Sequence, residues 1–161
     1  MDRVHVVLVG GVLIMAMVAC APAGGSGKFT MANAHVDPSY TCPNPAEDFA
    51  YDVHGTIDAD NGTGSQVTIQ SMSSTTTTVA THGSWLGPLG EIDDESDLLF
   101  SPNSVGSGSK TTVHFTIPFG CTDTPHVGIL DTYGEFAVHV SVVTSAGTFE
   151  LDANRHRLKT P

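Results

Sequence analysis

The sequence predicts an all-β domain, an antiparallel sandwich, that follows an N-terminal export signal. Three observations favour this class. Apolar and polar residues alternate with a period of two in several short segments, as in half-buried strands. Turn residues recur about every ten positions between these segments, which is the spacing of a sandwich or barrel. The 161-residue chain is rich in Gly, Ser and Thr, and helix-forming residues dominate no window.

The first elements follow from prolines and from this alternation. Three prolines predict an irregular arm over residues 28–47, because proline cannot donate to a strand ladder. A strand is expected over residues 49–57, where aromatic and branched residues occupy every second position. The Asn61-Gly62 step predicts a turn over residues 58–62, since both residue types tolerate positive φ. Two further strands are expected over residues 66–72 and 75–82.

The second half of the chain repeats the pattern. Residues 84–97 are less regular and hold the single tryptophan, Trp85. Short apolar segments then predict the remaining strands over residues 97–100, 113–117, 136–143 and 148–151. The total is about seven strands, enough for one sandwich.

One strand pair carries a family resemblance. Pro102-x-Ser104-Val105-x-x-Gly108, followed by Thr-Thr-Val-x-Phe-Thr over residues 111–116, resembles part of bacterial immunoglobulin-like modules. The resemblance covers some twenty residues. It implies an immunoglobulin-like antiparallel β-sandwich, which we place at residues 29–154.

The N-terminal segment has the pattern of a signal peptide. A short polar start is followed by a thirteen-residue apolar run over residues 6–18, too short for a membrane span of about 20 residues. The junction Met17-Val18-Ala19-Cys20 resembles the lipobox of bacterial lipoproteins. That resemblance implies cleavage after residue 19, diacylglycerol on the Cys20 thiol, and a flexible tether over residues 20–28. The alternative is an ordinary secretory signal that contains a cysteine.

The lipoprotein resemblance also bears on the other two cysteines. If Cys20 is acylated, Cys42 and Cys121 remain as one pair, and an exported chain is in a compartment where disulfides persist. Their bridge would join the N-terminal arm to a loop and stabilise the domain by roughly 4 kcal/mol on the chain-entropy model.

Charge excludes one class of partner. The net charge is −11, and Lys110 is the only base between residues 29 and 154. A domain with so many more acidic than basic side chains has a negatively charged surface, which repels phosphate backbones. We therefore expect no nucleic-acid binding. Acidic surfaces also repel anionic lipid, so any membrane attachment must come from a part of the protein other than this surface. The basic residues 155–161 are expected to form a frayed C-terminal tail.

Two metal sites are conceivable. His54, His114 and His139 each occupy the polar face of an expected strand, and neighbouring strands would let them converge on zinc or copper. The acidic run over residues 91–97 offers oxygen ligands for calcium. The simpler interpretations are polar-face histidines and a solvated acidic loop.

Little in the sequence indicates catalysis. No Gly-x-Ser-x-Gly elbow occurs, and pairing of the cysteines would leave no thiol nucleophile. Trp85 stands in a Gly/Pro-rich loop, where it is either a contact for a ligand or a plug at the end of the sandwich.

The sequence therefore predicts a lipid-anchored protein on the extracytoplasmic face of a membrane, the outer membrane if the cell has two. Its domain is expected to be a non-catalytic binding or structural module for a protein or glycan. We expect no cofactor besides the lipid on Cys20. The alternatives are a metal-binding envelope protein and a small exported hydrolase.

Overall fold

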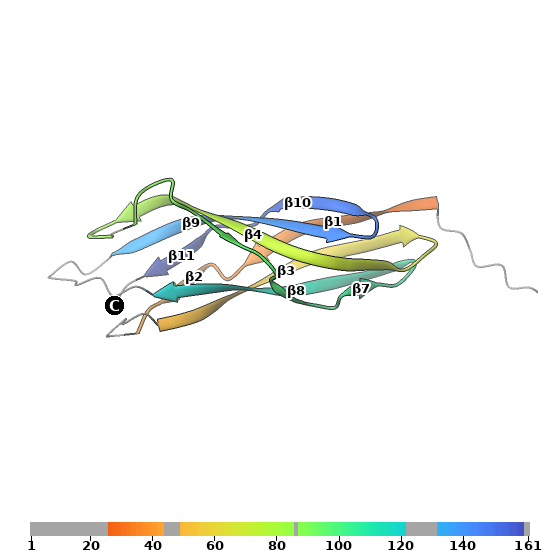
Figure 1. The fold of residues 1–161 in the computed structure, drawn as a ribbon, viewed down its shortest axis with the longest axis horizontal. Helices are drawn as coiled ribbons and strands as arrows, with labels where there is room; N and C mark the ends of the chain where they lie inside the picture. The colour runs from red at the N-terminus through yellow and green to blue at the C-terminus, as the bar shows by residue number, and fades with distance from the viewer. Residues whose placement is uncertain (1–25, 44–48, 86, 122–131, 160–161) are drawn as a thin grey trace, which may run out of the picture.

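A computed structural model describes residues 26–43, 49–85, 87–121 and 132–159. Within these residues every regular element is a strand, and the strands form two sheets packed face to face (Figure 1). The strands are β1 (Ser26–Val36), β2 (Ser39–Thr41), β3 (Phe49–Thr63), β4 (Val67–His82), β5 (Ile92–Glu95), β6 (Leu99–Ser101), β7 (Ser104–Val105), β8 (Ser109–Cys121), β9 (Tyr133–Thr144), β10 (Gly147–Asp152) and β11 (His156–Lys159). No helix in the described ranges is long and apolar enough to cross a membrane.

The two sheets have different compositions. Sheet A has the order β1-β3-β8-β6, and sheet B has the order β2-β11-β9-β4-β5 with β10 beside β9 and β7 beside β4. The pairings are antiparallel except that of β11 with β2. This arrangement confirms the predicted antiparallel, immunoglobulin-like β-sandwich. The described residues hold eleven strands rather than about seven. The strands predicted at residues 66–72 and 75–82 are one continuous strand, β4, whereas the arm, the acidic run, residues 104–105 and the C-terminal segment form strands that were not predicted.

The core lies between the sheets and is built by the predicted alternation. Ile57 and Val113 of sheet A and Val140 and Val142 of sheet B are fully buried. Phe115 lies flat over its cross-strand partner Gly55, where an added Cβ would be 2.1 Å from the ring. A glycine at position 55 is therefore what allows the largest fully buried side chain, Phe115, to fit.

The irregular arm predicted for residues 28–47 is wrong in its first half. Residues 26–36 form β1, an edge strand paired with β3, and the prolines begin only after it. Ser26–Lys28, assigned to the tether, belong to this strand, so the domain starts earlier than residue 29. The rest of the tether, with Cys20 and the signal peptide, lies outside the described residues.

The turn predicted at residues 58–62 is also wrong. Asn61 and Gly62 lie inside β3, because that length of β3 pairs with β1 on one side and β8 on the other. Asn61 is fully buried, and its side-chain amide donates to the carbonyl oxygens of Ser65 and Val105. Tertiary pairing thus overrides the local turn preference.

Residues 156–159 of the predicted frayed tail form an interior strand instead. β11 lies between β2 and β9, with His156 and Leu158 buried and Arg157 on the other face. Arg157 forms an ion pair with Glu135, and its guanidinium carbon lies 4.3 Å from the centre of the Tyr133 ring. Alternation therefore governs this basic segment as well.

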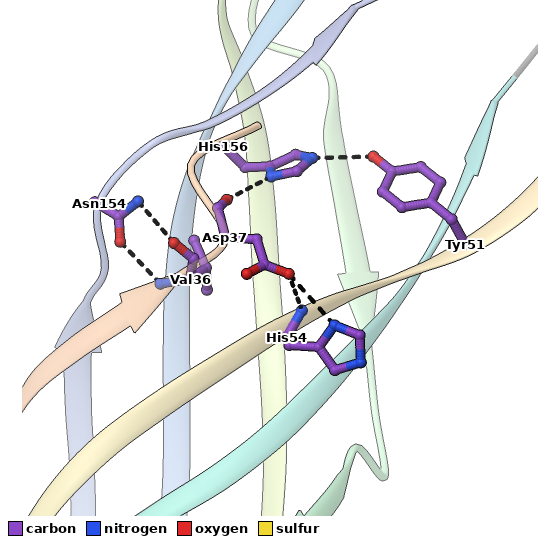
Figure 2. Close-up of polar contacts among 6 residues, drawn as sticks. All are labelled: Val36, Asp37, Tyr51, His54, Asn154 and His156. Carbon is purple, nitrogen blue, oxygen red and sulfur yellow. Dashed lines mark hydrogen bonds and ion pairs between the residues drawn. The ribbon is translucent and has the colours of Figure 1, made fainter. Parts of the chain in front are cut away.

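A polar cluster fixes the point where the chain crosses between sheets (Figure 2). The Asn154 side chain bonds the backbone of Val36 twice, accepting from its N–H at 2.8 Å and donating to its carbonyl at 2.9 Å. His156 bonds the carbonyl oxygen of Asp37 through Nδ1 at 2.7 Å and the Tyr51 hydroxyl through Nε2 at 3.0 Å. These bonds attach the segment after β1 to both β3 and β11.

The structure contains the expected bridge between Cys42 and Cys121, with both cysteines buried. Cys42 follows β2 of sheet B, and Cys121 ends β8 of sheet A. The disulfide thus ties the two sheets together at one end of the sandwich.

Candidate functional site

A groove of about 660 Å³ opens between the sheets at one end of the sandwich. It lies where β4 and β8 end and β9 begins, on the left in Figure 1. Sheet B contributes residues of β4, β5, β9 and β11, sheet A contributes the end of β8, and the loop after β4 closes one side. The lining of this groove combines aromatic, hydroxyl and carboxylate side chains.

Aromatic rings form one wall of the groove. Trp85 meets Phe136 edge-on with ring centroids 6.0 Å apart, and Phe136 meets Phe119 in the same way at 5.4 Å. The series continues inward from Phe119 to Tyr51 at 5.7 Å, and Tyr51 stacks on Tyr40 at 4.0 Å. Edge-to-face and stacked pairs of this kind hold one another in place, so this wall is preorganised.

Trp85 is both a packing residue and a groove residue. Its indole lies against Gly134, where an added Cβ would be 2.6 Å from the ring. The side chain is only half-buried, and it lines the groove beside Gly87 and Pro88. The two interpretations of this residue, ligand contact and end plug, are therefore compatible in this structure.

The sheet B wall is polar where a sandwich interior is usually apolar. Beyond Met72 the inward positions of β4 are Ser74, Thr76 and Thr78, all buried. Thr76 and Thr78 line the groove, and the buried hydroxyl of Ser74 beside them has no hydrogen-bond partner among the described residues. The Thr76 hydroxyl donates to the carbonyl oxygen of Asp93 at 3.4 Å, so this polar run joins β4 to β5 and gives the groove a wall that carries hydroxyl groups.

Carboxylates line the open edge of the groove. Glu91, Asp93 and Glu95 are alternate residues at and within β5, so they share one strand face, and all three line the groove. No Lys, Arg or His is among the described lining residues. None of the three carboxylates takes part in an ion pair found within the described ranges. The result is an aromatic groove with an uncompensated negative rim.

The acidic segment at residues 91–97, considered as a calcium loop, is not a loop over most of its length. Most of it is the strand β5, paired with β4 through Thr77↔Ile92 to Ser74↔Glu95. Alternate side chains on a strand lie about 7 Å apart, too far for three carboxylates to share one ion. Asp94 points to the other face and accepts a hydrogen bond from the Thr75 hydroxyl at 2.6 Å.

The structure does not bring the three predicted histidine ligands together. His54 and His114 share the outer face of sheet A and line a hollow of about 370 Å³ with His35. His139 lies on β9 of sheet B, so the predicted convergence of all three is wrong. Across the described chain no three His, Cys, Asp or Glu side chains are arranged to hold a metal ion.

Each of two predicted ligands has a carboxylate partner instead. His54 Nδ1 lies 3.3 Å from an Asp37 carboxylate oxygen. His139 lies between Asp152, at 2.8 Å from Nδ1, and Glu150, at 3.0 Å from Nε2. The Asp152 hydrogen bond is the largest cause that raises the pKa of His139, and Glu150 adds to it, while partial burial opposes both.

Sequence reasoning singled out Trp85 and the acidic run but not the groove between them. Nothing local marks Thr76 or Thr78 as groove residues, because their β-branched run equally predicts an ordinary strand. Phe119 and Phe136 follow the strand alternation and resemble core residues until the sheets are placed.

No family model and no curated protein matches this chain. Similar solved structures include the putative ApaA protein from Bordetella pertussis, 15% identical, with a TM-score of 0.39 over 83% of this chain and 94% of that one. A PapD-like domain of human CEP192 is 13% identical, with a TM-score of 0.28 over 95% and 94%. The periplasmic chaperone SfaE is 11% identical, with a TM-score of 0.29 over 82% of this chain and 55% of that one. Similarity at this level identifies neither a family nor an activity.

Proposed function

We propose that this protein is an exported lipoprotein whose sandwich is a non-catalytic binding module. The observation that carries the proposal is the position of the groove. β1 begins beside Thr63 at one end of β3, whereas Cys121 pairs with Phe49 at the other end, next to the groove. Fourteen residue steps of β3 separate these ends, about 45 Å. A chain held at its N-terminal side would present the groove away from its attachment (Figure 1).

The attachment rests on the residues before β1. The lipobox-like Met17-Val18-Ala19-Cys20 places a thiol six residues before Ser26. Acyl chains on Cys20 would hold the protein at the extracytoplasmic face of a membrane, since each buried CH₂ contributes about 0.8 kcal/mol and two or more chains give stable attachment. If the cell has two membranes, the proposal allows attachment to the outer one.

The binding role rests on the lining of the groove. A preorganised aromatic wall, hydroxyls and carboxylates around an open space are the features that protein and glycan binding sites share. No covalent or redox step is needed for such a role, and we assign no cofactor besides the lipid.

Membrane partition of Cys20→Ser tests the attachment. We expect wild-type protein in the membrane fraction with incorporated palmitate, and Cys20→Ser in the soluble fraction without label. The matched control is Cys42→Ser with Cys121→Ser, which removes the other two cysteines and keeps Cys20. Continued membrane association of Cys20→Ser would contradict the proposal.

A further inference from the structure

We propose that the groove binds an extended, cationic segment of a polypeptide that carries Lys or Arg at alternate positions and an apolar side chain beside them. This inference rests on the proposed binding role and names the chemistry of the partner. It draws on three independent features: the charge of the rim, the apolar surface around it, and the free edge of β5.

The charge of the rim selects a cation. Glu91, Asp93 and Glu95 point to one face at intervals of about 7 Å, and no basic side chain among the described lining residues neutralises them. Alternate basic residues on a neighbouring extended chain have the same spacing, so three pairs could form at once. An anionic or neutral partner would leave these carboxylates without compensation.

The surface around the rim selects an apolar side chain as well. Ile92 and Leu89 are 62% and 65% exposed, and Ile92 shares the outer face of β5 with Asp94, at the rim of the groove. The half-buried rings of Trp85 and Phe136 offer faces on which the aliphatic stem of Lys or the guanidinium of Arg packs. A partner that was only charged would leave this apolar area in water.

The edge of sheet B selects a polypeptide over a glycan. β5 is the last strand in the order of its sheet and pairs only with β4 within the described residues. Half of its backbone N–H and C=O groups therefore face outward beside the groove. Only an extended peptide backbone pairs with such groups in register, which would place its alternate side chains opposite Glu91, Asp93 and Glu95.

Fluorescence of Trp85 tests the inference directly, because it is the only tryptophan of the chain. The full-length protein in detergent is titrated with the capped peptide Lys-Val-Lys-Val-Lys-Phe, with its Glu-for-Lys counterpart, and with a deacetylated chito-oligosaccharide as a cationic glycan. We expect a saturable change with the lysine peptide alone, and weaker binding as salt is added.

Variants locate the binding. Glu91→Gln with Asp93→Asn and Glu95→Gln should weaken binding of the lysine peptide about tenfold, since three exposed pairs of modest strength are lost. The control Asp52→Asn with Asp58→Asn and Asp60→Asn removes the same charge from β3 and should bind as wild type does. The single variant Asp93→Asn should weaken binding by a smaller factor, and thermal melting checks that each variant folds.

The outcomes separate this inference from the proposed function. Equal weakening by the β3 control, or no response of Trp85 to the lysine peptide, would overturn the inference. A response to the chito-oligosaccharide but not to the peptide would also overturn it and would leave the groove as a glycan-binding site. The membrane-partition experiment tests only the lipid anchor, so its result does not decide which ligand the groove binds.

Discussion

Two hydrogen bonds of buried His156, to the Asp37 carbonyl and to the Tyr51 hydroxyl, fix which ring nitrogen of the histidine carries the hydrogen. The Asp37 carbonyl can only accept, so Nδ1 of His156 carries the hydrogen and Nε2 accepts from the Tyr51 hydroxyl. Burial lowers the pKa of His156 and raises that of Tyr51, so both groups are neutral near pH 7. The neutral pair therefore satisfies every polar atom that it buries.

Removing the Tyr51 hydroxyl should destabilise the fold. Tyr51→Phe leaves Nε2 of buried His156 without a partner, which costs about 1–3 kcal/mol in the free energy of unfolding. The matched control is Tyr40→Phe, because Tyr40 stacks on Tyr51 and the Tyr40 ring is kept in this variant. Urea unfolding measures both, and an equal loss in the two variants would contradict the role of the hydroxyl.

Stability should fall in mild acid because of His156. Its pKa in the folded protein lies below the ordinary value of 6.5, so the unfolded state binds a proton first as pH falls. The contribution of the neutral ring is thus complete above pH 6.5 and is lost below it. We expect the stability advantage of wild type over His156→Gln to shrink between pH 7.5 and pH 5.5 in urea titrations. An advantage that grows in acid would have the wrong sign.

The pKa of His139 is shifted in the opposite direction from that of His156, so the pH dependence of its contribution to stability should have the opposite sign. Its pKa is raised chiefly by the hydrogen bond to Asp152, with a smaller contribution from Glu150. Asp152→Asn should therefore lower the pKa of His139 more than Glu150→Gln does, and an NMR titration of the imidazole signals measures both. The linked stability is present below pH 6.5 and is lost as pH rises through the raised pKa. The reverse ranking of the two variants would contradict the geometry.

Among single residues, the sequence indicated the Cys42–Cys121 pair, because only two cysteines remain if Cys20 is acylated. It also singled out Trp85, because this tryptophan stands in a Gly/Pro-rich segment. It could not indicate the burial of His156, which stands between two arginines in a segment that resembles a solvated tail. That residue is buried only because β11 enters the sheet between β2 and β9.

At the scale of elements, β11 should contribute to stability as an interior strand does. Leu158→Ala should lower the free energy of unfolding by about 2–5 kcal/mol, since it empties buried space beneath the groove. Leu89→Ala, at a leucine that is 65% exposed, should change it by less than about 0.5 kcal/mol. Chemical denaturation measures both, and a neutral Leu158→Ala would contradict the position of β11.

The disulfide should matter because it closes a long segment of chain. Cys42 and Cys121 are 79 residues apart, and a closed loop of this length is worth roughly 4 kcal/mol on the chain-entropy model. Cys42→Ala with Cys121→Ala should therefore shift urea unfolding to lower concentration without changing the strand content seen by circular dichroism. An unchanged midpoint would contradict the bridge.

Strands were predictable wherever one face of the segment is buried. β8 and β9 contain the predicted segments 113–117 and 136–143, because branched and aromatic residues alternate there with polar ones. The Asn61-Gly62 step failed as a turn signal, since pairing on both sides keeps β3 extended. β5 failed as well, because its acidic residues resemble a loop and its pairing with β4 is not encoded locally.

At the scale of the whole molecule, the fold class was predictable and the groove was not. Turn spacing and alternation are distributed over the chain and predict a sandwich. The groove draws its walls from β4, β5, β8, β9 and β11, and only the packing of the sheets brings them together. A site of that kind leaves no contiguous signal in the sequence.

The arrangement as a whole joins three parts in series. The segment before β1 supplies the proposed anchor, the disulfide-tied sandwich supplies a spacer of about 45 Å, and the far end supplies the groove. The proposed anchor would determine where the groove meets its partner.

An intact mass of the natively expressed protein tests the anchor most directly. The account predicts a chain that begins at Cys20 and carries diacylglycerol there, with or without an amide-linked acyl chain, and that lacks the two hydrogens lost on pairing Cys42 with Cys121. A mass that retains residues 1–19, or that leaves Cys20 free of lipid, would contradict it.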